Sequence, residues 1–289
     1  MQTRPLEEQV RALDAGAAFA ELIDVGVTVV SGTDARGWLN DLVTTDVASL
    51  DRFDGRPSLL LSPTGRIRAS VHVLGAGGGA FFLAQAADQP EPIGSLLAPY
   101  VLSADVAIRE VPVRIFAIPG RADAPDGIAG AHGPSVLGGG IDVLAGTGHE
   151  PEVEILRTEL SRQGLEPAST AAVELRRIER GDPRFPIDLD VDSLPAEAGL
   201  DAAPVTDRSK GCFLGQESVA KVANLGHPPR VVLAMRGRRP VTAGEPVLRD
   251  REPVGVITSA AGHLAIVRVV WHARADRLVT GSGVPLEPR

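Results

Sequence analysis

The segment after Gly226-His227-Pro228-Pro229 places the strongest limit on the fold of this 289-residue chain. From there on, short runs of β-branched and other apolar residues are separated by glycine and proline; they cover residues 231–235, 245–248, 254–258 and 264–270. Strands this short bury their apolar faces only when several of them pack together as a sandwich or barrel. The pattern therefore predicts a C-terminal β-barrel domain over 227–289, preceded by a larger region over 1–226.

Residues 1–226 mix helical and strand-like patterns. Apolar residues recur at helical spacing over 6–23, 35–43, 153–163 and 170–179, and β-branched runs occur at 25–30, 58–61 and 67–74. Asp34 precedes the second helical segment, which it is expected to cap. The mixture predicts an α+β protein, and the length predicts more than one subdomain before the barrel. Repeated Pro and Asp make residues 182–209 irregular, which is typical of functional loops.

Composition disfavours several classes of function. A formal net charge of −8 disfavours nucleic acid as a main partner, because binders of the phosphate backbone need a basic surface. No apolar stretch approaches the roughly 18 residues of a membrane span, and the first eight residues include acidic residues where a signal peptide would need an apolar run. We therefore expect a cytoplasmic protein with no membrane partner.

The chain has a single cysteine, Cys212, so no internal disulfide forms and the chain alone cannot supply the ligands of an iron–sulfur cluster. The histidines are not paired at zinc-ligand spacing, and we expect no metal site.

Cys212 lies in the segment KGCFLGQE, residues 210–217. A lone cysteine in such a protein is by default a small buried hydrophobe. However, Lys210 lies two residues away, and a nearby ammonium favours the reactive thiolate. Gly211 and Gly215 let the backbone approach another group closely. A helix that starts near Ser218 would add the same bias toward the anion. Both interpretations of Cys212 stay open at this point, as a working thiol or as a packing residue.

Residues 210–217 resemble the K-G-C-[YF]-x-G-Q-E signature of the YgfZ family of folate-binding proteins. Further segments agree with this resemblance: Arg177 to Pro183 resembles R-I-x-x-G-x-P, and residues 194–197 (LPAE) resemble L-P-x-E. Residues 38–47 (WLNDLVTTDV) and 62–67 (SPTGRI) resemble segments near the start of this family, the first of which also occurs in the glycine-cleavage T-protein. The resemblance runs from about 24 to 275 and is missing from about 119 to 150.

The resemblance implies a T-protein-like aminomethyltransferase fold, with two intertwined α+β subdomains around a central folate pocket and a C-terminal β-barrel. It implies tetrahydrofolate or a one-carbon derivative as the ligand. It also implies a role in assembling or repairing iron–sulfur clusters, with assembly proteins or client enzymes as partners and Cys212 and Lys210 as the working residues.

Several residues are implied to bind the folate. Glu179 stands where the T-protein pattern L-R-x-E-x-G has a carboxylate that meets the pterin, and a carboxylate can accept two hydrogen bonds from a 2-aminopyrimidinone edge. Arg177, Gly211, Gln216 and Glu197 complete the candidate site. Glu179 can also be a plain surface residue, Arg177 can be the structural partner of a carboxylate, and Glu197 can hold the 182–209 segment instead of the ligand.

The T-protein transfers an aminomethyl carbon, and its pattern G-G-I-x-D-D contains an aspartate that serves the substrate amine. Residues 65–70 read GRIRAS here, so Ala69 and Ser70 stand where the carboxylates would be. Neither side chain is charged at neutral pH or acts as a comparable base. This favours a non-enzymatic role. A folate-dependent aminomethyltransferase or other one-carbon enzyme, and a non-catalytic folate-sensing module, are the alternatives.

Overall fold

A computed structural model describes residues 4–128, 132–146 and 150–289; Met1 to Thr3 of the N-terminal segment lie outside it. The chain divides into two compact units, which are described separately. Unit 1 comprises Met1–Leu60, Arg68–Glu174 and Pro204–Phe213, and unit 2 comprises Leu61–Ile67, Leu175–Ala203 and Leu214–Arg289.

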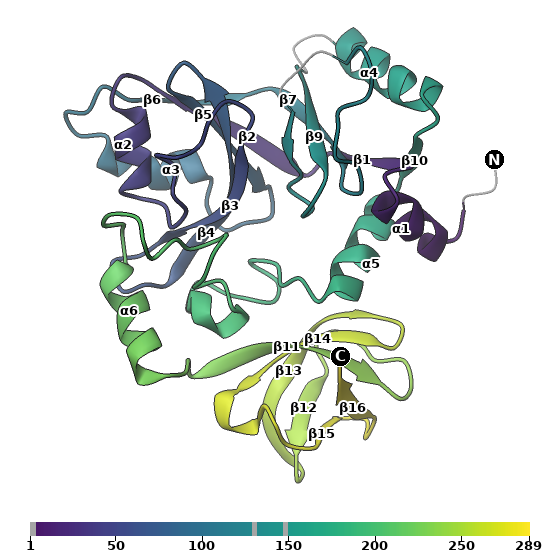
Figure 1. Cartoon of the computed structure of the whole chain (residues 1–289). Coiled ribbons are helices and arrows are strands. Elements are labelled where there is room, and N and C mark those ends of the chain that lie inside the picture. Colours follow the sequence, from purple (N-terminus) through teal and green to yellow (C-terminus); the bar gives the residue numbers. More distant parts are fainter. Residues whose placement is uncertain (1–3, 129–131, 147–149) are drawn as a thin grey trace. The chain divides into compact units, whose positions relative to one another are not determined.

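Unit 1 is built on two five-stranded sheets (Figure 1). The first sheet has the order β10-β1-β7-β9-β8 and the second has the order β3-β4-β5-β2-β6. The strands of the first sheet are β1 (Ala18–Leu22), β7 (Val113–Ile118), β8 (His132–Pro134), β9 (Ile141–Gly146) and β10 (Glu166–Ala168). The strands of the second are β2 (Val25–Ser31), β3 (Gly55–Leu61), β4 (Ile67–Gly77), β5 (Ala80–Ala86) and β6 (Ala107–Val111).

Alternation along β7 gives the first sheet two apolar faces. Ile115 and Ala117 pack in one core with Val27 of β2, whereas Phe116 and Ile118 pack in a second core. That second core includes Leu160 of helix α4 (Glu150–Arg162). Because successive strand residues point to opposite faces, one strand contributes to both cores. The first sheet therefore packs against a helix on one face and shares a core with the second sheet on the other.

The remaining helices are short. They are α1 (Leu6–Asp14), α2 (Ala35–Asn40), α3 (Ile93–Leu97), α5 (Thr170–Arg180) and α6 (Gln216–Leu225), with single 3-10 turns at Ala98–Tyr100, Pro195–Ala198 and Trp271–Ala273. In the part of the chain that is described, none of the helices has the length and apolar character needed to cross a membrane.

Unit 2 contains a closed six-stranded barrel of order β11-β14-β13-β12-β15-β16, in which β16 pairs back to β11. Its strands are β11 (Arg230–Gly237), β12 (Pro246–Arg249), β13 (Glu252–Ala261), β14 (Leu264–Val270), β15 (Leu278–Thr280) and β16 (Pro285–Pro288). Fully buried residues such as Val247, Ile257 and Val267 fill the barrel. The α+β class and the C-terminal barrel are confirmed, and the domain limit at 226/227 stays a prediction.

Two local expectations are wrong, and two helix boundaries differ by two or three residues. The segment 6–23 is not one helix, because α1 ends at Asp14 and residues 18–22 pair with β7 and β10 as strand β1. Its alanines suit a helix, but tertiary pairing overrides such weak propensities. Asp34 makes no side-chain cap; its carboxylate accepts the backbone N–H of Asp105 at 2.8 Å instead. Helix α2 ends at Asn40 and α6 begins at Gln216, two residues before Ser218.

Candidate functional site

The cysteine segment (residues 204–213) is an irregular stretch that docks on the loop after α2 within unit 1. The hydroxyl of Thr44 donates to the carbonyl of Val205 at 2.7 Å, and that of Thr45 donates to the carbonyl of Pro204 at 3.3 Å. The backbone N–H of Asp207 donates to the carbonyl of Thr44 at 3.0 Å. These bonds fix the first half of the cysteine segment.

Lys210 fixes the second half. Its ammonium donates to the backbone carbonyls of Asn40, Val43 and Thr45 at 2.5, 2.6 and 2.7 Å. It also lies 5.5 Å from the centre of the Phe213 ring, a cation–π distance. Burial lowers the pKa of Lys210 to about 8, against the opposing charges of nearby aspartates, so the side chain is mainly charged at neutral pH.

Gly211 and Cys212 are both exposed, between half-buried Lys210 and buried Phe213. A side chain at Gly211 would meet nothing within 4 Å, so the backbone there is open to an approaching group. The thiol of Cys212 is free. Of the two interpretations of this cysteine, the packing residue does not fit an exposed side chain.

Ala69 and Ser70, where the resemblance implies that the T-protein has carboxylates, lie on β4. Ala69 is fully buried, and the backbone of Ser70 exchanges hydrogen bonds with the side chain of Gln89 at 2.7 and 2.9 Å. Neither residue supplies an acid or base.

Arg177, at the C-terminal end of α5, is tied to a buried aspartate within unit 2. It donates to Asp188 at 2.6 Å and to the hydroxyl of Ser259 on β13 at 2.7 Å. Asp188 is fully buried and also accepts from Thr258 at 2.5 Å and from the backbone N–H of Arg184 at 2.9 Å. The contacts of Arg177 are therefore those of a structural partner of a carboxylate.

Glu179, two residues further along α5, has an exposed side chain. Its backbone carbonyl accepts from Arg289, and its carboxylate has no hydrogen-bond partner among the described residues. A carboxylate in this state is free to accept hydrogen bonds from a ligand.

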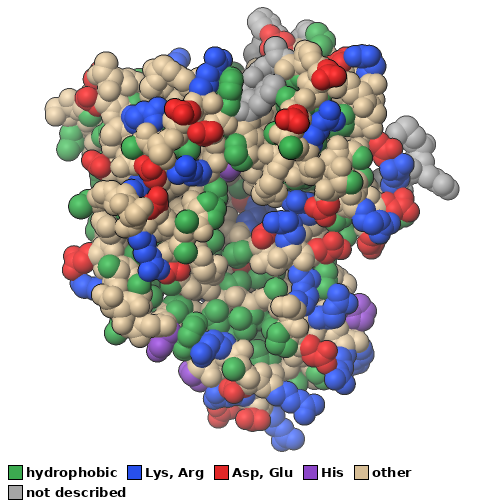
Figure 2. Space-filling view, viewed as in Figure 1, with side chains coloured by type: hydrophobic (Ala, Val, Ile, Leu, Met, Phe, Trp, Pro, Cys, Tyr) green, Lys and Arg blue, Asp and Glu red, His purple; other side chains and the backbone are tan. Residues whose placement is uncertain are grey.

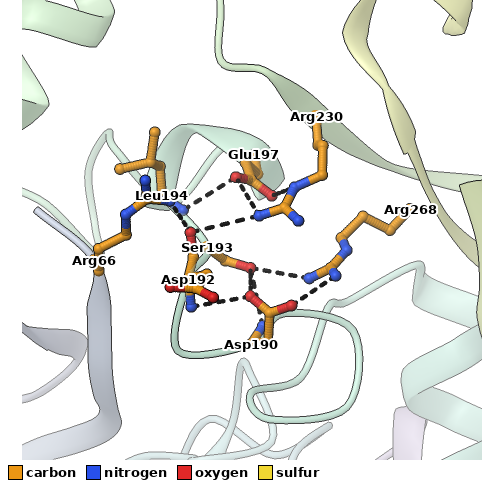
Figure 3. A network of polar contacts seen from close by, with 8 residues as sticks. All are labelled: Arg66, Asp190, Asp192, Ser193, Leu194, Glu197, Arg230 and Arg268. Carbon is orange, nitrogen blue, oxygen red and sulfur yellow. Dashed lines mark hydrogen bonds and ion pairs between the residues drawn. The ribbon is translucent and has the colours of Figure 1, made fainter.

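Glu197 is fully buried and belongs to the polar network of Figure 3, all of it within unit 2. Its carboxylate pairs with Arg230 at 3.2 Å and accepts the backbone N–H of Leu194 at 3.3 Å. In the same network Arg268 donates to Asp190 at 2.7 Å. Burial opposes ionisation of Asp190, but its bonds from Arg268 and Ser193 hold its pKa at about 2. These contacts hold the 190–197 segment on the barrel strands β11 and β14.

Gln216 is the first residue of α6, and its side chain is half-buried with no hydrogen-bond partner among the described residues. The preceding Gly215 has a positive φ of 83°, and a side chain there would lie 2.6 Å from the carbonyl of Ser62. Only glycine allows this close approach of the turn 62–65 to the start of α6.

The seven predicted site residues thus fall into groups. Lys210, Gly211 and Cys212 are together in unit 1, whereas the other four lie in unit 2, with Arg177 and Glu179 on α5 and Glu197 and Gln216 elsewhere. No group of three or more His, Cys, Asp or Glu side chains over 4–128, 132–146 and 150–289 is arranged to hold a metal ion. On the face shown in Figure 2, basic side chains are interspersed with acidic ones.

Sequence reasoning missed the carbonyls that receive Lys210, since backbone acceptors carry no sequence signal. It also missed Asp188, which is one of three alternating aspartates at 188, 190 and 192. That spacing in an irregular segment is the signal that would have found Asp188.

Comparison with known proteins gives both a fold and sequence relatives. The crystal structure of the glycine cleavage system aminomethyltransferase T from Bartonella henselae superposes with a TM-score of 0.81, covering 98% of this chain and 88% of that one at 17% identity. This likeness confirms the T-protein-like fold. No family model matches the sequence.

Sequence relatives point in the same direction. An aminomethyltransferase of Rippkaea orientalis is 32% identical over 140 residues, which are 48% of this chain and 38% of the relative; the chain thus covers well under half of that relative. An aminomethyltransferase of Prosthecochloris aestuarii is 26% identical over 93% of this chain and 82% of its own length. A mitochondrial "iron-sulfur cluster assembly factor IBA57 homolog" of Cryptococcus neoformans is 26% identical over 77% of this chain and 67% of its own length. The chain therefore has the fold of the glycine-cleavage T-protein and is related in sequence to T-protein-like proteins.

Proposed function

We propose that this protein binds tetrahydrofolate, or a one-carbon derivative of it, and acts in the assembly or repair of iron–sulfur clusters in other proteins. The observation that carries the proposal is the exposed Cys212, held on a T-protein-like fold whose β4 has Ala69 and Ser70 in place of the carboxylates. A relative named as an iron–sulfur cluster assembly factor homolog supports the same role. The expected partners are assembly proteins or client enzymes, and the cellular site of action we expect is the cytoplasm.

Within this proposal, the hydrogen-bond partners of the predicted residues distinguish those that contact the ligand from those that hold the structure in place. The side chains of Glu179 and Gln216 have no hydrogen-bond partner among the residues that the structure describes, so we assign them to the folate. The Glu179 carboxylate suits the 2-aminopyrimidinone edge of the pterin, to which it would accept two hydrogen bonds. Arg177 and Glu197 already have protein partners, and we assign them to holding α5 and the 190–197 segment.

Calorimetric titration with tetrahydrofolate and its 5-formyl form tests the folate site. We expect the wild type to bind. Glu179→Gln should weaken binding by about 10- to 100-fold, because a hydrogen bond to a charged group contributes about 1.5–3 kcal/mol. Glu287→Gln, which removes an exposed carboxylate from the Arg238 pair on the barrel, is the control and should bind like the wild type.

The absence of heat and of a thermal shift at millimolar ligand would refute the folate site. Equal affinities for Glu179→Gln and the control would remove Glu179 from it.

Aminomethyl transfer is the second candidate, since relatives at 32% identity carry that name. It requires turnover of the folate together with an aminomethyl donor. With no carboxylate at residues 69 and 70, we expect stoichiometric binding without turnover.

A further inference from the structure

The Lys210 ammonium is held by the carbonyl cage, the three backbone oxygens of Asn40, Val43 and Thr45. An ammonium has three N–H donors, and each finds one carbonyl at 2.5–2.7 Å. The side-chain oxygen of Asn40, at 3.5 Å, adds a fourth and weaker contact. The donors of Lys210 are therefore used within the cage.

The surroundings of the cage are electronegative. The carboxylates of Asp46, Asp41 and Asp207 all favour the charged form of Lys210. Three backbone carbonyl oxygens with three aspartate carboxylates nearby are the kind of oxygen ligands that a cation site has. Here the cation is supplied by the chain itself.

Because Lys210 lies two residues before Cys212, the cage that holds Lys210 also affects the position of Cys212. The bonds with Thr44 and Thr45 reach Pro204, Val205 and Asp207, all of which precede Lys210. The backbone N–H of Lys210 also donates to the Asp207 carboxylate at 3.3 Å. Cys212 lies between Lys210 and buried Phe213, and the Lys210 ammonium is 5.5 Å from the centre of the Phe213 ring. Fixing Lys210 therefore fixes the exposed thiol between them.

We propose that the carbonyl cage is a cation site that takes a primary ammonium, and that Lys210 is a positioning residue whose ammonium occupies this site to hold Cys212 in place. Lys210 acts by hydrogen bonding into the cage, and its charge does not serve to activate the thiol. The proposal stands whether or not the protein binds folate or serves iron–sulfur clusters.

Chemical rescue of the full chain tests the site. Lys210→Ala leaves the cage without its cation, and hydrogen exchange over 205–213 should become at least about tenfold faster, as expected when an anchored loop opens locally. Methylammonium at up to about 100 mM, above the millimolar effective concentration of a tethered group, should restore slow exchange. Tetramethylammonium has the same charge but no N–H donor, and it should restore nothing.

Cys212 alkylation by iodoacetamide supplies the readout that a general loss of stability would not move. In Lys210→Ala and Lys210→Met the rate should change with loop mobility while the pH midpoint of alkylation stays that of the wild type. Lys221→Ala, which removes an exposed lysine from the Glu217 pair, is the matched control and should change neither quantity. If the alanine variant does not fold, Lys210→Met is used to compare the pH midpoint of alkylation with the wild type. Lys210→Arg is then used to compare the rate of hydrogen exchange over 205–213. The planar guanidinium of arginine does not match the cage, so exchange should still rise in Lys210→Arg.

Two results overturn the proposal. One is a pH midpoint that rises in the Lys210 variants while exchange over 205–213 is unchanged, which would make Lys210 an activator of the thiol. The other is equal rescue by methylammonium and tetramethylammonium, or rescue by neither, which would remove the cation site.

Discussion

Asp188 illustrates what single residues contribute to this fold. It is fully buried, pairs with Arg177 at 2.6 Å, and accepts hydrogen bonds from both Thr258 and Ser259 on β13. A buried carboxylate is tolerated only when it is paired and hydrogen-bonded in this way. Asp188 therefore joins the end of α5 and the irregular segment after it to the barrel within unit 2.

Asp188→Asn should lower the free energy of unfolding by about 3–5 kcal/mol, because it breaks a buried ion pair by removing the charge of one partner. Asp182→Asn is the control: it removes a carboxylate that pairs with Arg180 while both are about half exposed (46% and 49%), and such pairs contribute at most about 1 kcal/mol. Urea unfolding of both variants measures the difference. Equal losses in the two variants would contradict the structural role of Asp188.

At the scale of single residues, the sequence predicted the side chains of the candidate site better than the groups to which they hydrogen-bond. Cys212, Gly211 and Lys210 were predicted as one group, and the structure places them in one segment, in which Gly211 and Cys212 are exposed and Lys210 is half-buried. The predicted function of Lys210 was tuning the thiol, whereas its hydrogen bonds go to carbonyls of residues 40–45, far away in the chain. A contact between a side chain and a distant backbone leaves no pattern in one sequence, because every residue offers the same carbonyl.

At the scale of secondary-structure elements, strands β4 and β9 of unit 1 place two polar side chains in one buried cavity. His72 on β4 and Asp142 on β9 come from the two different sheets and line one small cavity, whose other lining residues, such as Val27, Phe82 and Leu144, are apolar. His72 Nε2 and Asp142 Oδ1 have no hydrogen-bond partner among the described residues. Burial lowers the pKa of His72 to about 4 and raises the pKa of Asp142 to about 7.

These shifts have opposite effects on stability. Asp142 has a higher pKa in the folded state, so its contribution is present at low pH and is lost as the pH rises toward 7. His72 has a lower pKa in the folded state, so its contribution is present above its unfolded value of 6.5 and is lost as the pH falls toward 4. Between pH 4 and 6.5 the contribution of Asp142 to the free energy of unfolding falls with pH while that of His72 rises, so the two changes cancel in the wild type.

Single substitutions should separate the two slopes. Relative to the wild type, Asp142→Asn should gain stability as the pH rises from 4 to 6.5, by about 3 kcal/mol across this range, since one pKa unit corresponds to about 1.4 kcal/mol. His72→Gln should lose a similar amount over the same range. Urea midpoints at several pH values measure both trends. Parallel profiles for the wild type and both variants would contradict the buried titration of this pair.

The sequence predicted long elements better than short ones. The helical spacing over 153–163 and 170–179 and the strands after residue 230 are all present. Strand β1, by contrast, was read as part of a helix, because its residues AFAEL have mixed propensity and only pairing with β7 and β10 makes them a strand. Pairing across such distances in the chain is a tertiary effect that local spacing does not encode.

At the scale of the whole molecule, the fold and the chemistry separate. The chain keeps the T-protein architecture at a TM-score of 0.81 although only 17% of the aligned residues are identical. A fold hosts different functions according to the residues of its site. In this chain Ala69 and Ser70 lie on β4, and Cys212 has an exposed thiol. The resemblance of residues 210–217 predicted the fold, and local physics alone predicted only a mixed α+β chain with a terminal barrel.

The central claim is that Cys212 works in iron–sulfur cluster assembly or repair. Its most direct test is the activity of cluster-dependent enzymes in a strain that lacks the endogenous factor, complemented with the wild type or with Cys212→Ala at equal soluble levels. Because Cys212 is exposed, the substitution should leave folding nearly intact, within about 0.5 kcal/mol. We predict that the wild type restores these activities and that Cys212→Ala does not, whereas full restoration by Cys212→Ala would contradict the claim.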